Sequence, residues 1–174
     1  LETDIRDGSD FEIYISHDPF INPEETYSLS WLLEMHQKIS PESIIALNIK
    51  SDGLYDKLEY VLKDFPCGKY FLFDMSVPDF LVGCKKNLNL YCRASYYEDA
   101  RPFKDIAAGV WVDCFDDRYP LQDNLLTLAN QWSNLAFVSP ELHARSRENF
   151  WHSLKALLPL APSSSCMMLC TDYP

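Results

Sequence analysis

LETDIR, residues 1–6, has the composition of a short β-strand and carries two acidic residues, Glu2 and Asp4, two positions apart. Successive side chains of a strand point to opposite faces, so these two carboxylates share one face. If that face is buried, the charges repel, and at least one carboxyl stays protonated unless a cation lies between them. The run therefore predicts a strand whose polar face lines a site.

Six similar runs follow along the chain, and helix-like segments separate most of them. The strand-like runs lie at residues 1–6, 43–50, 69–75, 88–95, 107–115, 134–142 and 166–174, and the helix-like segments at 23–39, 52–65, 77–86, 121–133 and 145–158. Residues 12–18 predict an extra strand or extended loop. Strands that alternate with helices indicate a parallel sheet covered by helices, and near-continuous apolar runs indicate strands buried on both faces.

The polar residues of these runs gather at their carboxyl-terminal ends. They are Glu2, Asp4, Asn48, Lys50, Asp74, Arg93, Ser95, Asp113, Ser139, Glu141 and Asp172. An open sheet of seven strands would concentrate its site at one switch point, whereas a barrel builds its site from the carboxyl ends of many strands. The pattern therefore favours an α/β fold of the (β/α)8 TIM barrel type, formed as a single domain over residues 1–174, with the first strand lying upstream of residue 1.

The charge and the cysteines restrict the partners. A net charge of −11 over 174 residues argues against nucleic acid or an anionic membrane surface, because both require clustered Lys and Arg. No stretch reaches the length of an integral membrane segment. The six cysteines show no CxxC pair or zinc-ligand spacing, which predicts reduced core thiols and a cytoplasmic protein. We therefore expect a small-molecule partner.

The opening stretch resembles a known family. Residues 2–18, ETDIRDGSDFEIYISHD, resemble the signature of glycerophosphodiester phosphodiesterases, which combines a Glu-x-Asp pair, a polar turn with an Asp (here Asp10) and a His-Asp pair (here His17 and Asp18). Residues 46–53, ALNIKSDG, resemble the Leu-Glu-Ile-Lys of the next strand in that family. Asn48 stands where many members have a metal-binding Glu, and Gly8 replaces the usual turn Thr. The resemblance implies a barrel of the phosphatidylinositol-phosphodiesterase-like superfamily.

The same resemblance implies a metal-dependent phosphodiesterase that cleaves a small or head-group phosphodiester to a phosphomonoester and an alcohol. Glu2, Asp4 and Asn48 would bind a divalent cation, Mg²⁺ or Ca²⁺, because both ions prefer oxygen ligands. Lys50 would hold a phosphate oxygen, and His17 would be the general acid that protonates the leaving alcohol. A second histidine would come from the family's first strand, upstream of Leu1.

Further candidates would contact the substrate. Arg6 falls where the family has a basic or polar residue, and Arg93 could bind phosphate with two donors. Trp111 and Asp113 share a strand face, so that Trp111 could cover a glycerol or sugar group while Asp113 accepts its hydroxyls. The alternatives are a rim ion pair for Arg93 and a core position for Trp111.

Other interpretations stay open. In an inert rim, the two carboxylates would form ion pairs with Lys50 and Arg93. Loss of an anionic ligand at Asn48 could leave a sugar-phosphate or polyol sensor of the same fold. A third hypothesis is a metal-independent lyase that closes the phosphate on a neighbouring hydroxyl.

Overall fold

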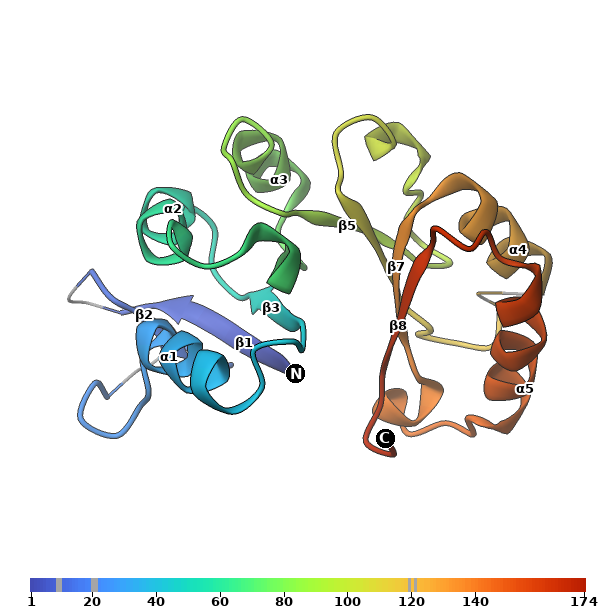
Figure 1. The fold of residues 1–174 in the computed structure, drawn as a ribbon, viewed down its shortest axis with the longest axis horizontal. Coiled ribbons are helices and arrows are strands. Elements are labelled where there is room, and N and C mark those ends of the chain that lie inside the picture. Colours follow the sequence, from blue (N-terminus) through green and yellow to red (C-terminus); the bar gives the residue numbers. More distant parts are fainter. Residues whose placement is uncertain (9–10, 20–21, 119, 121) are drawn as a thin grey trace. The chain divides into compact units, whose positions relative to one another are not determined.

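The computed structural model describes residues 1–8, 11–19, 22–118, 120 and 122–174. The chain forms two compact units, Leu1–Leu90 and Tyr91–Pro174, and each is described by itself. Figure 1 shows strands and helices alternating along both. The first unit contains β1 (Glu2–Asp7), β2 (Ile13–Ile15), α1 (Leu29–Ile39), β3 (Ile45–Ile49), α2 (Tyr55–Leu62), the 3-10 turn η1 (Cys67–Lys69), β4 (Tyr70–Phe73) and α3 (Val77–Gly83). The second contains β5 (Tyr91–Ala94), η2 (Arg101–Phe103), β6 (Gly109–Val112), α4 (Gln122–Gln131), β7 (Asn134–Val138), η3 (Pro140–His143), α5 (Glu148–Leu157), η4 (Leu158–Leu160) and β8 (Cys166–Cys170).

The sheet of the N-terminal unit has the strand order β2-β1-β3-β4. β1, β3 and β4 are parallel, and the short β2 pairs with the second half of β1 in the antiparallel sense. Ile5, Leu47 and Leu72 are fully buried. On β1 and β3, Ile5 and Leu47 alternate with Asp4 and Asn48, so one face of these strands is apolar core and the other carries the polar side chains, whereas β4 is apolar on both faces.

The sheet of the C-terminal unit has the order β5-β6-β7-β8, and all three pairings are parallel. Val110, Val112, Leu135 and Phe137 form its fully buried face. These pairings confirm the predicted mixed α/β fold with parallel sheets. Closure of the strands into a (β/α)8 barrel stays a prediction.

The helix α2 begins at Tyr55 with Leu54 in the cap position and no side-chain cap bond. One local expectation is wrong, the burial of the cysteines as core thiols. The six cysteines are free, but only Cys92 and Cys114 are buried. The others lie on exposed or half-buried segments, where an apolar neighbourhood in the sequence does not produce core burial.

No helix in the described part of the chain is both long enough and apolar enough to cross a membrane.

Gly109 allows close packing of Tyr91, its register partner on β5. A Cβ at Gly109 would lie 2.5 Å from Cζ of the buried Tyr91 ring. We expect Gly109→Ala to lower the free energy of unfolding by about 1–3 kcal/mol, because the ring must leave its packed position. Urea denaturation measures the change.

Gly68→Ala is the matched control, since a Cβ there meets nothing within 4 Å and the backbone φ is not in the left-handed region. That variant should be unchanged or slightly more stable. Equal urea midpoints for the wild type and Gly109→Ala would contradict the packing argument.

Candidate functional site

The register of β1 and β3 places the predicted metal-binding residues on one face. Asp4 is the register partner of Asn48, and Glu2 is the partner of Ala46, so all of these side chains share a face. Lys50 follows β3 directly, and its N–H donates to the carbonyl of Ile5 at 3.0 Å. The expectation that Glu2 lies at a carboxyl end is wrong, because β1 runs to Asp7 and Glu2 begins it.

Lys50 lies between two carboxylates. Its Nζ atom is 3.5 Å from Oδ1 of Asp4 and 3.5 Å from Oδ2 of Asp74, and all three side chains are only partly exposed. Asp74 follows β4 in the left-handed conformation, with φ +74°. We call Glu2, Asp4, Asn48, Lys50 and Asp74 the carboxylate–lysine cluster. Asp74 was not among the predicted ligands, although it stands directly after the buried run YFLF.

The carboxyl of Glu2 is destabilised in its charged form. Glu2 as a whole residue is exposed, but protein atoms around its carboxyl partly exclude water, and this partial desolvation raises its pKa; the neighbouring charge of Asp4 raises the pKa further. Lys50 and a hydrogen bond from the Asn48 amide act in the opposite direction but do not cancel the shift. A bound cation would relieve this repulsion, as the sequence argument requires.

Two buried polar atoms beside the cluster have no hydrogen-bond partner within the described ranges. They are Oδ1 of Asn48, an acceptor, and Nε of Arg6, a donor. The Nη2 atom of Arg6 donates to the carbonyl of Lys50 at 2.6 Å, which holds this side chain against β3. A buried polar atom without a partner costs about 1–3 kcal/mol, so each of the two is a place where a water, an ion or a ligand could bind.

The ligand set for a metal is sparse. Across the described residues, no three His, Cys, Asp or Glu side chains converge on a point that could hold an ion. Glu2 and Asp4 supply two carboxylates, and the unpartnered Asn48 oxygen supplies a neutral third ligand. Such a hard-oxygen set fits Mg²⁺ or Ca²⁺, with water completing the coordination.

His17 is not in contact with the cluster. Its imidazole is exposed, and Nδ1 lies 3.3 Å from Oδ1 of the adjacent Asp18. The backbone next to His17 lies nearer to the cluster than the imidazole does, because the Ser16 N–H donates to the backbone carbonyl of Asp4 at 3.1 Å. The catalytic role of His17 therefore stays a prediction, and Asp10 lies outside the described residues.

Arg93 and Trp111 are register partners in the C-terminal unit. Nη1 of Arg93 lies 3.6 Å from Oε2 of Glu98, and its guanidinium lies 5.5 Å from the centre of the Phe115 ring. Trp111 is buried. Arg93 thus forms the ion pair, and Trp111 occupies the core position, that the sequence analysis gave as alternatives. Their roles in substrate binding stay predictions.

Asp113 has a partner that sequence reasoning missed. Its Oδ1 lies 2.7 Å from Nε2 of His143, on the turn η3. From the sequence, His143 is expected to be a surface or packing residue on a helix-like segment, as are His36 and His152. Asp113 follows β6 and His143 follows β7. The pair could have been indicated only by the fact that these two strands are neighbours in the sheet.

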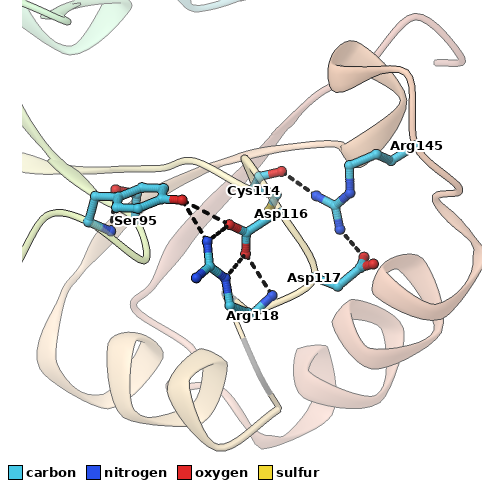
Figure 2. Close-up of polar contacts among 7 residues, drawn as sticks. Ser95, Cys114, Asp116, Asp117, Arg118 and Arg145 are labelled. Atoms are coloured by element: carbon cyan, nitrogen blue, oxygen red, sulfur yellow. Dashed lines mark hydrogen bonds and ion pairs between the residues drawn. The ribbon is translucent and has the colours of Figure 1, made fainter.

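The loop after β6 is held by two arginines, as Figure 2 shows. Arg118 binds the carboxylate of Asp116 through Nε at 3.0 Å and the hydroxyl of Tyr97 through Nη2 at 2.6 Å. Arg145 donates from Nη1 to the carbonyl of Cys114 at 2.5 Å and also forms an ion pair with Asp117. The loop is thereby tied to the segments after β5 and β7.

Comparison with known proteins supports the fold. No family model matches the sequence, and no curated protein does. A solved structure described as a "putative glycerophosphodiester phosphodiesterase" from Galdieria sulphuraria matches 99% of this chain with a TM-score of 0.76 and 14% sequence identity, and the match covers 81% of that chain. The chain therefore shares the fold of that protein.

Proposed function

We propose that this protein is a metal-dependent phosphoric diester hydrolase of the glycerophosphodiester phosphodiesterase type. Its substrate would be a small or head-group phosphodiester, and its products a phosphomonoester and an alcohol. The structural likeness to a protein described as such an enzyme supports the proposal. So does the agreement of residues 2–18 and 46–53 with the family signature.

One observation carries the proposal: the carboxylate–lysine cluster has an unpartnered acceptor on Asn48, and Arg6 beside the cluster has an unpartnered donor. Oδ1 of Asn48 lacks a positive partner, and Nε of Arg6 lacks a negative one, among the residues described. A divalent cation bound to a phosphodiester would supply a positive partner for Asn48 and a negative partner for Arg6. Buried polar atoms are usually hydrogen-bonded, and an ion or ligand bound here would supply both missing partners.

The roles follow from the chemistry of each side chain. Glu2, Asp4 and Asn48 would hold Mg²⁺ or Ca²⁺, and the ion, when bound, would offset the negative charge of the phosphate. Lys50 would bind a phosphate oxygen, with Arg6 as a second donor. His17 would transfer a proton, a step that typically contributes ~10²–10⁴-fold in rate.

Hydrolysis of a chromogenic phosphodiester, with and without a chelator, tests the proposal. We expect turnover that the chelator abolishes and that added Mg²⁺ or Ca²⁺ restores. No turnover with any divalent cation would favour the sensor hypothesis, which the sparse ligand set also supports. Turnover that resists the chelator would favour a metal-independent lyase.

Glu2→Gln should separate two effects of the Glu2 charge, its cost to the stability of the cation-free protein and its contribution to cation binding. Since the pKa of Glu2 is raised, the native state favours the protonated form, and the wild type loses stability as the pH rises through that pKa. Without cation, the variant should therefore melt at a higher temperature than the wild type near neutral pH. The difference should vanish below the unperturbed pKa of Glu, where the wild-type side chain is also neutral.

Addition of the cation should reverse the order of the two melting temperatures, so that the wild type melts above Glu2→Gln. At a concentration of about 100 times Kd, binding stabilises the wild type by about 2.7 kcal/mol, and the variant should gain much less. Thermal unfolding with and without Ca²⁺ or Mg²⁺ measures both effects. Equal stabilisation of the two proteins would exclude Glu2 as a ligand.

Lys50→Met should lower kcat/KM by about 10- to 100-fold, because a hydrogen bond to a charged group contributes about 1.5–3 kcal/mol. Lys86→Met is the matched control, since Lys86 also lies between two carboxylates, Asp56 and Glu59, at 2.8 Å each. Steady-state kinetics on the chromogenic diester measure both variants. A similar loss in the two variants would assign the effect to stability rather than to phosphate binding.

A further inference from the structure

The carboxylate of Asp74 reaches Lys50 through an unusual backbone conformation. Asp74 has the strand parity of the fully buried Leu72, so a regular extension of β4 beyond Phe73 would direct this carboxylate into the apolar face. Instead, Asp74 takes a φ of +74°, and Nζ of Lys50 donates to its Oδ2 at 3.5 Å. Non-glycine residues held in this conformation cluster at functional sites. The charge of Asp74 is thus placed against Lys50 at a conformational cost.

The loops that follow β3 and β4 are tied to one another. Oγ of Ser76 donates to Oδ2 of Asp52 at 2.7 Å, and Oδ1 of the buried Asp79 accepts the N–H of Gly53 at 3.0 Å. The backbone of Lys50 is bonded to β1 on its other side. With both backbones held, the long side chain of Lys50 is the part of this arrangement that can turn between two carboxylates.

The ammonium of Lys50 lies where it competes with a cation for Asp4. Its Nζ atom is 3.5 Å from Oδ1 of Asp4, which is one of the proposed cation ligands, and both side chains are only partly exposed. Two positive charges against one carboxylate repel each other, and partial burial weakens the screening by solvent and salt. Lys50 therefore has to withdraw from Asp4 when that carboxylate binds a cation, and Asp74 is the second carboxylate already in contact with it.

We propose that Asp74 is a positioning residue that receives the Lys50 ammonium when Asp4 binds the cation, an inference that rests on the phosphodiesterase function proposed above. Lys50 then keeps a carboxylate partner and stays in the site, and the remaining donors of its ammonium are left for a phosphate oxygen. Without the charge of Asp74, the ammonium would stay on Asp4 and oppose the cation. Cation affinity thus depends on Asp74 through Lys50, and not through direct ligation.

Titration calorimetry of the metal-free protein with Ca²⁺, and separately with Mg²⁺, tests this dependence in a double-mutant cycle of Asp74→Asn and Lys50→Met. Asparagine also adopts the left-handed conformation, so the first substitution removes the charge and keeps the backbone. Asp74→Asn should raise Kd by about 3- to 10-fold, and Lys50→Met should lower it by a similar factor, because each changes the competition for Asp4. In the Lys50→Met background, the addition of Asp74→Asn should change Kd by less than about twofold.

Asp56→Asn is the matched control, because Asp56 is likewise one of two carboxylates in contact with a lysine, Lys86, outside the cluster. Its Kd should equal that of the wild type. Circular dichroism reports folding in every variant, and Asp74→Gly replaces Asp74→Asn in the cycle if the latter misfolds, since glycine adopts a positive φ most easily. An equal rise in Kd on removal of the Asp74 charge, with and without Lys50, would make Asp74 a direct ligand and overturn the positioning role.

Failure of this inference and failure of the proposed function give different results. An unchanged Kd in Asp74→Asn, beside chelator-sensitive hydrolysis by the wild type, would remove the positioning role alone. If the wild type binds neither Ca²⁺ nor Mg²⁺, the proposed cation site and this inference fall together. The expected cycle of Kd values without any hydrolysis would support the role of Asp74 and contradict the proposed reaction.

Discussion

The parallel pairing of β1 with β3 is the constraint on which the candidate site depends. It sets Asp4 beside Asn48 and keeps both on the face opposite to Ile5 and Leu47. A slip of one residue would turn the carboxylates into the apolar core and the isoleucines out of it. The burial of Ile5 and Leu47 therefore sets the register of the two strands and, with it, the positions of Asp4 and Asn48. The polar residues do not have to stabilise the sheet themselves.

The cluster costs stability in the protein as it stands. Glu2 and Asp4 share a face, the pKa of Glu2 is raised, and two buried polar atoms lack partners within the described residues. Native proteins tolerate such costs mainly at functional sites, where a ligand supplies the missing interactions. Lys50 reduces the repulsion through its contacts with Asp4 and Asp74, but one cation shared between two carboxylates at 3.5 Å each does not neutralise both.

Much of the fold could be predicted from the sequence, because the signals are local. The alternation of apolar runs with amphipathic segments predicted the parallel strands and the α-helices but not the short 3-10 turns. Residues 12–18, expected to form an extra strand or an extended loop, contain the strand β2. Strand parity placed Glu2 and Asp4 on one face, and the register confirms that Asn48 joins them. The cap of α2 and the exposure of most cysteines could not be predicted, since both depend on packing between elements.

The part of the site that depends on distant residues could not be predicted. Asp113 and His143 meet only because β6 and β7 are neighbours, and no spacing rule links positions thirty residues apart. Asp74 stood at the expected end of its run, but the sequence did not indicate that its side chain turns toward Lys50. Asp74 adopts a positive φ, a conformation in which aspartate is enriched but which most aspartates do not take, so the sequence alone did not indicate it.

That conformation limits how this position can evolve. A non-glycine residue in the left-handed region costs on the order of 1–3 kcal/mol, and glycine or asparagine would adopt the same φ of +74° more easily. Neither of them would bring a negative charge to Lys50. Aspartate at position 74 thus has a higher conformational cost than glycine or asparagine but forms an ion pair with Lys50. Glycine at this position would relieve the backbone strain and remove the ion pair with Lys50 in one step, while the buried strand before it stays unchanged.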